Sequence, residues 1–310
     1  MKKNLTKQYY KFLKLKNRIF QGRPVLVLMY HRISNVSDKK LAHLTVSVTN
    51  FEKQLVYFKE KYQILKLSDD WTSLKKTGLV ITFDDGYADN IINALPLLEK
   101  YQIPATIFVT TLNTNTIKEF WWDRLAYDYS NVEEFFCFPS LKDKVFKEQY
   151  TYKYIVEFVS KLDNDQKEIW FLEFEKSNKI FFQNREEYRP LTNLELKQLS
   201  EHPLIDIGIH SHNHYSLGNL TYEEQKNELS FSVEKLNELT TKNIKYLALP
   251  HGSYNGDTLK AIEDIGILGV LYANNYYSNF NNKSSGKINR ILIPSISDEE
   301  LVRYMKHYDF

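Results

Sequence analysis

Short runs of apolar and β-branched residues recur along the chain, and longer amphipathic stretches separate them. Runs of about four to eight such residues, bounded by Gly, Pro, Asn or Asp, are typical of strands. Stretches with apolar residues three or four positions apart are typical of helices. The predicted strands are 24–31, 62–67, 79–84, 105–110, 205–210, 244–249, 269–273 and 291–294.

Capping boxes, in which Glu follows Thr by three residues, open several of the helical stretches. The boxes are Thr49-x-x-Glu52, Thr192-x-x-Glu195 and Thr221-x-x-Glu224, before helices predicted at 51–62, 194–200 and 222–239. Strands that alternate with helices predict an α/β fold around a parallel sheet, either closed into a barrel or open.

Residues 112–200 interrupt this alternation. The segment is rich in Lys, Glu, Phe and Tyr, has helical periodicity around 152–174, and contains no convincing strand. We interpret it as a helical insertion between two strands of one domain that spans 24–310. A chain of 310 residues with 43% hydrophobic residues is long enough to bury such a core.

The formal net charge is only +2, which gives no reason to expect a nucleic-acid partner. Cys137 is the only cysteine, so an internal disulfide is excluded. No stretch approaches the roughly 18 apolar residues of a spanning helix, and no apolar secretion signal is visible. These features favour a cytoplasmic protein.

Positive charge is concentrated at the N-terminus, where nine Lys and Arg residues precede the first acidic residue, Asp38. Residues 1–23 alternate these charges with Tyr, Phe and Leu, a pattern that fits a basic amphipathic arm. Residues 1–20 could contact the inner face of an anionic membrane, or they could form a solvated helix against the domain. Both interpretations remain open at this point.

Asp84 and Asp85 end one predicted strand, and His210 and His214 follow another. Burying two adjacent carboxylates is costly unless a cation or a proton relieves their repulsion. His residues four apart in a helical turn place both rings on one face, where they can bind one metal ion. One Asp and two His would form a facial triad with open positions for water and substrate.

Three motifs in register resemble those of the polysaccharide deacetylases, carbohydrate esterase family 4 with the NodB homology domain. They are the runs 82–86 (Thr-Phe-Asp-Asp-Gly), 210–214 (His-Ser-x-x-His) and 249–255 (Leu-Pro-His-Gly-Ser-Tyr-Asn). The resemblance covers roughly residues 24–295. It implies an irregular (β/α)7 barrel, in which catalytic groups lie at the carboxyl ends of the strands.

The resemblance also implies roles for the motif residues. Asp84 would be the general base, and Asp85, His210 and His214 would bind a divalent metal, usually Zn²⁺, with Co²⁺, Ni²⁺ or Fe²⁺ as alternatives. A circularly permuted subgroup carries a Tyr-His-x-Ile motif at the first strand, and residues 30–33 match it. His31 would then be the general acid that protonates the leaving amine. A buried His bonded to backbone is the alternative.

Further residues are candidates for holding the substrate or its oxyanion. Pro250 and Gly252 would shape a tight turn that presents the backbone N–H of His251 to the oxyanion. Ala248 stands where many family members have an arginine that orients the base, and Arg290 could replace it or serve as a surface ion-pair partner. Tyr87 and the tryptophan pair Trp121-Trp122 complete the set. Each tryptophan could stack on a sugar ring, or it could pack in the core.

The function that these residues predict is metal-dependent N-deacetylation of an amino sugar in a cell-envelope glycan or in its lipid-linked, lipopolysaccharide-type precursor. An N-deformylase or another C–N hydrolase is a second possibility. A glycan-binding protein that has lost catalysis is a third, although the presence of all four motif Asp and His residues argues against it.

Overall fold

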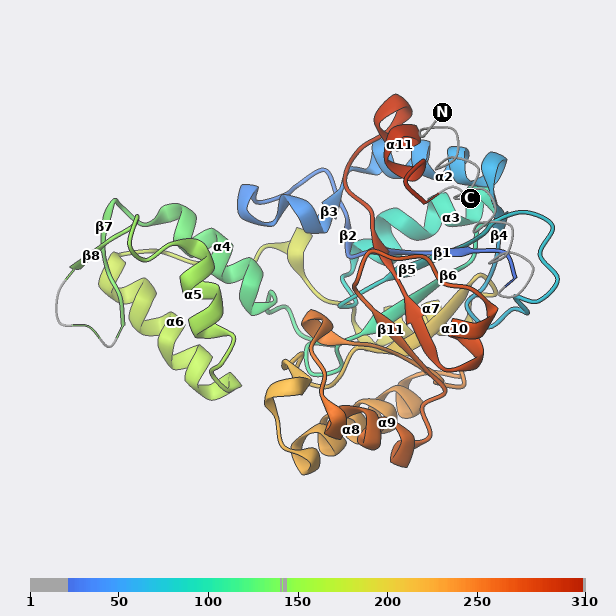
Figure 1. Cartoon of the computed structure of the whole chain (residues 1–310). Helices are drawn as coiled ribbons and strands as arrows, with labels where there is room; N and C mark the ends of the chain where they lie inside the picture. Colours follow the sequence, from blue (N-terminus) through green and yellow to red (C-terminus); the bar gives the residue numbers. More distant parts are fainter. Residues whose placement is uncertain (1–21, 140, 142–143, 309–310) are drawn as a thin grey trace, which may run out of the picture.

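The computed structural model is a nearly closed barrel of parallel strands surrounded by helices, with a separate group of helices beside it (Figure 1). The structure describes residues 22–139, 141 and 144–308. The sheet order is β12-β11-β10-β9-β6-β5-β1-β13, and β4 pairs with β5 outside this path. The strands are β1 (Val25–Tyr30), β4 (Gln63–Ile64), β5 (Gly78–Phe83), β6 (Ala105–Val109), β9 (Ile205–Ile209), β10 (Tyr246–Ala248), β11 (Gly269–Tyr272), β12 (Lys287–Asn289) and β13 (Ile291–Leu292).

The barrel closes through one interrupted strand. Arg290 alone separates β12 from β13, and these two strands pair in parallel with opposite ends of the sheet, β11 and β1. If β12 and β13 count as one position, the barrel has seven, namely β1, β5, β6, β9, β10, β11 and β12/β13. The predicted irregular (β/α)7 barrel is therefore confirmed, and the run predicted at 291–294 supplies only the second half of its closing strand.

Helices cover the outside of the barrel, and their N-termini follow the capping signals of the sequence in most cases. Thr192 and Thr221 cap their helices with full capping boxes, whereas the first of these helices is capped by Ser47 and not by Thr49. The barrel helices are α2 (Val48–Lys61), α3 (Leu95–Tyr101), α7 (Asn193–Glu201), α8 (Tyr222–Leu239), α9 (Gly256–Ile265), α10 (Phe280–Ser284) and α11 (Asp298–Met305), and a small parallel pair, β2 (Arg32–Ile33) with β3 (Thr45–Val46), lies near the mouth.

Strand periodicity separates the barrel interior from its helical coat. Along β1, Leu26 and Leu28 belong to the core between sheet and helices, whereas Val25 and Val27 belong to the core inside the barrel. Successive side chains of a strand point to opposite faces, so His31 continues the inner series at the carboxyl end. The same alternation assigns Asp84, His210 and Arg290 to the inner face of β5, β9 and the closing strand.

The segment between β6 and β9 has a hydrophobic core of its own. It contains α4 (Trp121–Asn131), the antiparallel hairpin β7 (Phe135–Cys137) and β8 (Lys144–Phe146), α5 (Tyr152–Val159) and α6 (Asn164–Asn178). Figure 1 shows these elements at one side of the barrel, in green. The sequence predicted no strand here, and its range of 112–200 was too long, because Leu196 and Leu199 of α7 pack in the barrel core. Below, "the insertion" means residues 121–178.

None of the helices in the described ranges is long and apolar enough to cross a membrane. The basic arm predicted for residues 1–23 lies, except for its last two residues, outside the described residues. Its contact with a membrane therefore stays a prediction.

Candidate active site

Strand register brings the candidate catalytic residues to one level at the barrel mouth. Tyr30 of β1 pairs with Phe83 of β5, so the residues that follow them, His31 and Asp84, leave the sheet side by side. Val109 and Ile209 pair in the same way on β6 and β9, and His210 follows. The carboxyl ends of neighbouring parallel strands meet at the same edge of the sheet, which explains how residues far apart in sequence come together.

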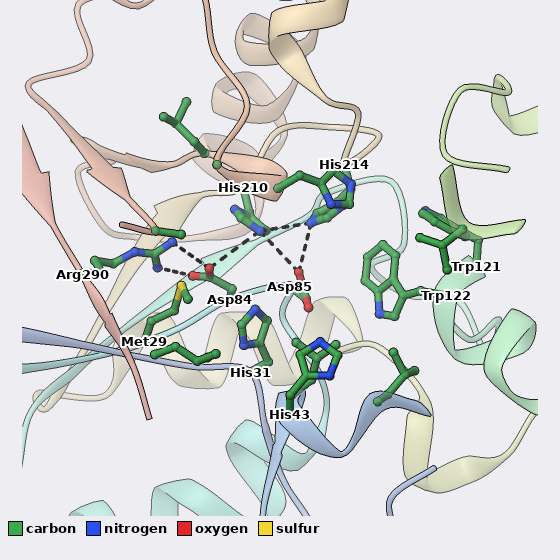
Figure 2. A pocket seen from close by; sticks show the side chains of 18 of the residues that line it. Met29, His31, His43, Asp84, Asp85, Trp121, Trp122, His210, His214 and Arg290 are labelled. Atoms are coloured by element: carbon green, nitrogen blue, oxygen red, sulfur yellow. Dashed lines mark hydrogen bonds and ion pairs between the residues drawn. The ribbon is translucent and has the colours of Figure 1, made fainter. Parts of the chain in front are cut away.

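Asp85, His210 and His214 converge so closely that their ligand atoms all lie within 4.8 Å of one another. The Oδ1 atom of Asp85 is 3.3 Å from the Nε2 atoms of both His210 and His214, and these two nitrogens are 3.2 Å apart. All three side chains are buried. Figure 2 shows the carboxylate and the two rings pointing toward one another.

The donor chemistry of this trio fits a divalent cation. The Nδ1 atom of His210 lies 2.9 Å from the carbonyl oxygen of Ala248. A carbonyl only accepts, so Nδ1 carries the proton, and the Nε2 of the neutral ring offers a lone pair. That lone pair faces the Asp85 carboxylate and the second imidazole, a repulsive arrangement that a cation would relieve. Two imidazole nitrogens and one carboxylate oxygen are ligands typical of zinc and of the facial triad of Fe²⁺.

Left-handed turns at the strand ends make this convergence possible. Asp85, Ser211 and His214 have positive φ angles of 73°, 61° and 56°. Such values are uncommon for residues with a Cβ and cost roughly 1–3 kcal/mol each. A continued strand would point Asp85 away from Asp84, whereas the turn returns its side chain to the mouth. The strain is therefore located where the ligand atoms meet.

Asp84 is held by a buried arginine. The Nη1 and Nη2 atoms of Arg290 donate to the two carboxylate oxygens of Asp84 at 2.6 and 2.8 Å, and Arg290 is fully buried. Burial raises the pKa of Asp84, but Arg290 and His210 lower it more, so the net pKa lies below its ordinary value. Asp84 is thus ionised and oriented. The burial of Arg290 is incompatible with a surface ion pair, and its place beside Asp84 fits the orienting role.

His31 lines the same cavity as Asp84 and Asp85, and its Nδ1 atom is buried without a hydrogen-bond partner among the described residues. Figure 2 shows the ring directed toward the two carboxylates. Burial lowers the pKa of His31, and the charges of Asp85 and Asp84 oppose this change. Because Nδ1 is not bonded to backbone, the geometry favours a side chain available to a substrate over a satisfied core histidine. Its role as general acid stays a prediction.

The turn after β10 lies opposite these groups. Pro250 is buried, while His251 and Gly252 line the cavity, and both have positive φ angles of 55° and 64°. The ring of His251 lies 4.5 Å from that of His214, measured between centroids. The turn therefore places the backbone of residues 251 and 252 beside the candidate metal ligands, where the sequence predicted an oxyanion contact.

Trp121 and Trp122 come from α4 of the insertion and form one wall of the cavity. Trp122 contacts His214 at 4.5 Å between ring centroids, and its Nε1–H donates to the Tyr87 hydroxyl at 2.7 Å. Tyr87 in turn donates to Asp123 at 2.6 Å and has no exposed surface. Tyr87 was predicted to contact substrate, and this burial corrects the prediction: it packs under the insertion and holds Trp122 in place.

The cavity that contains these groups has a volume of about 360 Å³, within the range of small-molecule sites. The candidate catalytic side chains line it together with mainly apolar side chains. Sequence reasoning assigned no role to His43 and overlooked several wall residues, because no motif marks them and only the folded chain brings them here. These additional residues are Met29, Leu41, His43, Leu44, Tyr152, Val156, Leu249, Ala273 and Leu292.

A comparison with protein families matches the polysaccharide deacetylase family over residues 72–134 and 163–270. A Bacillus subtilis protein named for the polysaccharide deacetylases, YxkH, is 24% identical over 77% of this chain and 61% of its own length. The poly-β-1,6-N-acetyl-D-glucosamine N-deacetylase of Staphylococcus aureus is 31% identical over 30% of this chain and 38% of its own length. The matches thus span less than two thirds of these relatives.

Among solved structures, the deacetylase PplD of Streptococcus pyogenes in complex with acetate superposes with a TM-score of 0.56. The alignment has 22% identity and covers 91% of this chain and 98% of that chain. Because the alignment covers nearly all of this chain, the likeness supports the fold of both the barrel and the insertion. The family match ends before the closing strand and omits 135–162, the middle of the insertion.

Proposed function

Because the chain belongs to the polysaccharide deacetylase family, a group of hydrolases that act on carbon–nitrogen bonds, we propose that it removes the acetyl group from an N-acetylated amino sugar. One observation carries the proposal. The ligand atoms of Asp85, His210 and His214 meet within 4.8 Å beside an ionised, arginine-held Asp84, at the floor of a cavity. This arrangement contains the groups that amide hydrolysis requires.

We propose that Asp85, His210 and His214 hold a divalent cation, with Zn²⁺ as the first candidate and Co²⁺, Ni²⁺ or Fe²⁺ as alternatives. Such an ion, when bound, lowers the pKa of a water molecule and polarises the acyl oxygen. The protein's own contribution is to arrange the ligands. The bond from His210 Nδ1 to the Ala248 carbonyl fixes the ring that presents Nε2.

Asp84 accepts the proton of the attacking water as the new C–O bond forms. It can do so because Arg290 keeps it ionised and aimed, although the same contact makes it a weaker base. The backbone N–H of His251 would donate a hydrogen bond to the oxyanion that develops on the acyl oxygen. His31, in its protonated form, donates to the nitrogen as the C–N bond breaks, so acetate and a free amine leave.

The walls of the cavity support a substrate with apolar character near the scissile amide. Leu41, Leu44, Tyr152, Val156 and Leu292 surround the catalytic groups. The hydroxyl groups of a glycan gain little from such walls, whereas its acetyl methyl group and the lipid of a precursor both gain from apolar contact. We propose a cell-envelope glycan or its lipid-linked precursor as the substrate class.

The test is to measure bound metal and released acid on one preparation. Incubation of the metal-loaded protein with N-acetylated and N-formylated glucosamine oligomers should release acetate and leave free amine in equal amounts. Faster release of formate from the matched oligomer would favour deformylation instead. A protein that binds metal and sugar but releases no acid would be a binding protein and would contradict the proposal.

A further inference from the structure

A second cavity lies behind the two tryptophans that form the wall of the catalytic cavity. Its volume is about 490 Å³, and Trp121, Trp122 and His214 line both cavities. Figure 2 shows the two indoles on one side of the Asp and His cluster, where the insertion lies. The two spaces are therefore neighbours that share a wall, and the second has the size of a small-molecule site. The proposed reaction uses only the first.

Lys167 of α6 is an unusual lining residue of the second cavity. Its side chain is only 5% exposed, yet it forms no ion pair with any residue in the described ranges. The ammonium donates to the carbonyl of Leu162 and lies 5.7 Å from the Trp121 ring and 5.0 Å from the Tyr215 ring. Burial lowers its pKa to about 8. An ammonium has three donors, so two remain for another acceptor.

The charged groups of the cavity are nearly balanced, which disfavours a highly charged ligand. Glu119 pairs with Arg185, and Glu168 and Glu175 both pair with Arg124. The acids are therefore largely occupied, whereas Lys167 is not. The lining contains three basic and four acidic side chains: Lys118, Arg124 and Lys167 against Glu119, Asp165, Glu168 and Glu175.

Asparagine amides supply further donors and acceptors. The side chain of Asn113 has no hydrogen bond to any described residue, and Asn164 uses its Nδ2 on Asn213 at 2.5 Å but leaves its Oδ1 without a described partner. Asn184 accepts from the Glu119 amide through its Oδ1. Neutral amides next to an indole match a sugar, which offers hydroxyl groups at its edge and C–H groups on its face.

We propose that this second cavity binds a neighbouring neutral sugar ring of the glycan whose N-acetyl group is hydrolysed. The ring would lie against Trp121, and its hydroxyl or acetamido oxygens would accept from Lys167 and bond to Asn113 and Asn164. The proposal rests on the proposed function and extends it: the substrate is an oligosaccharide that passes the Trp121–Trp122 wall, with the reacting sugar in one cavity and the next sugar in the other.

The test asks whether the effect of glycan length on binding and turnover depends on the Lys167 side chain. Binding of β-1,6-linked N-acetylglucosamine monomer and trimer is measured by calorimetry, and acetate release from the same sugars gives kcat and KM. Wild-type protein should prefer the trimer. Lys167→Met should lower trimer affinity and raise its KM about tenfold, as expected for a lost charge-assisted hydrogen bond, while the monomer is unaffected.

Two further variants separate the ligand contact from structural damage. Lys176→Met removes an exposed lysine from the same helix, and it should change the affinity and KM for neither monomer nor trimer. Asn113→Ala removes a side chain that has no described partner within the protein, and it should weaken trimer binding without lowering the melting temperature. Equal losses for monomer and trimer in Lys167→Met, or no preference for the trimer in the wild type, would overturn the inference.

Calorimetry keeps this inference distinct from the proposed function. If the protein releases no acetate but binds the trimer more tightly than the monomer, and Lys167→Met abolishes the difference, the second sugar site stands and deacetylation fails. If acetate is released equally well from monomer and trimer, with equal affinities in all variants, deacetylation stands and the second site fails.

Discussion

The barrel mouth and the insertion wall contribute to one cavity, but they are built in different ways. At the mouth, charged groups stand at strand ends and are held by short hydrogen bonds, such as those from Arg290 to Asp84. At the wall, Trp121, Tyr152 and Val156 stand on helices whose core is separate from that of the barrel. The difference suggests that the barrel supplies the chemistry and the insertion selects the substrate.

The largest expected effect comes from removing a candidate metal ligand at the mouth. Replacement of Asp85, His210 or His214 by Ala should abolish metal binding and lower turnover about 10³-fold or more, because the ion's electrostatic stabilisation is worth several kcal/mol. Asp84→Asn should lose turnover and keep the metal. Metal content by elemental analysis, beside acetate release, checks this. Equal metal loss in Asp84→Asn would make Asp84 a ligand.

Removing the candidate general acid should cost nearly as much. His31→Ala is expected to lower kcat by roughly 10²–10⁴-fold, the range for a lost acid or base, while the metal stays bound. An acid acts only while protonated, so wild-type activity should fall as pH rises through the His31 pKa, and that alkaline limb should vanish in the variant. A variant that retains the limb would direct the search to His251.

Removing the two hydrogen bonds from Arg290 to Asp84 should have an intermediate effect on turnover. Arg290→Met removes the charge that lowers the pKa of Asp84, so the pKa of this carboxyl should rise and the acidic limb of the rate profile should move to higher pH. At neutral pH we expect a loss of about 10–100-fold. Arg290→Lys restores the charge without the two-pronged geometry, and a partial recovery would show that both matter.

A smaller effect is expected at the junction of the two regions. Tyr87→Phe removes the acceptor of Trp122 Nε1 and the donor to Asp123 while leaving the ring. If the wall selects substrate, KM should rise a few-fold with little change in kcat, because a neutral hydrogen bond contributes about 1 kcal/mol. A fall in kcat with constant KM would assign Trp122 to the chemistry instead.

The insertion should also respond to pH independently of the mouth. Burial, together with the charge of Glu175, raises the pKa of Asp128 to about 8. The folded state therefore holds a proton that the unfolded state has lost, and stability should fall as pH rises from about 4 to about 8. Urea denaturation at pH 5.5 and 8 measures how much the free energy of unfolding falls between the two pH values. In Asp128→Asn this fall should be smaller by on the order of 1 kcal/mol. An unchanged slope would place the pKa in its ordinary range.

The sequence was informative wherever period-two alternation controls the outcome. Odd positions of β1 and even positions of β5 face the barrel interior, so once the apolar runs are recognised as strands, the alternation of side chains also fixes which face His31 and Asp84 occupy. The same holds for His210. Local signals failed where backbone turns matter: nothing in the run 84–86 showed that Asp85 would adopt a positive φ angle and turn back toward the mouth.

The sequence by itself therefore determined the α/β class, the strand ends that carry Asp84, Asp85, His210 and His214, and their family resemblance, because these depend on periodicity and on short motifs. Only the tertiary structure decided that Arg290 meets Asp84 across 206 positions of the chain, that Tyr87 is buried, and that Trp121 and Lys167 border a second cavity. Such contacts depend on how the barrel closes and how the insertion packs, and these long-range relations leave no local pattern.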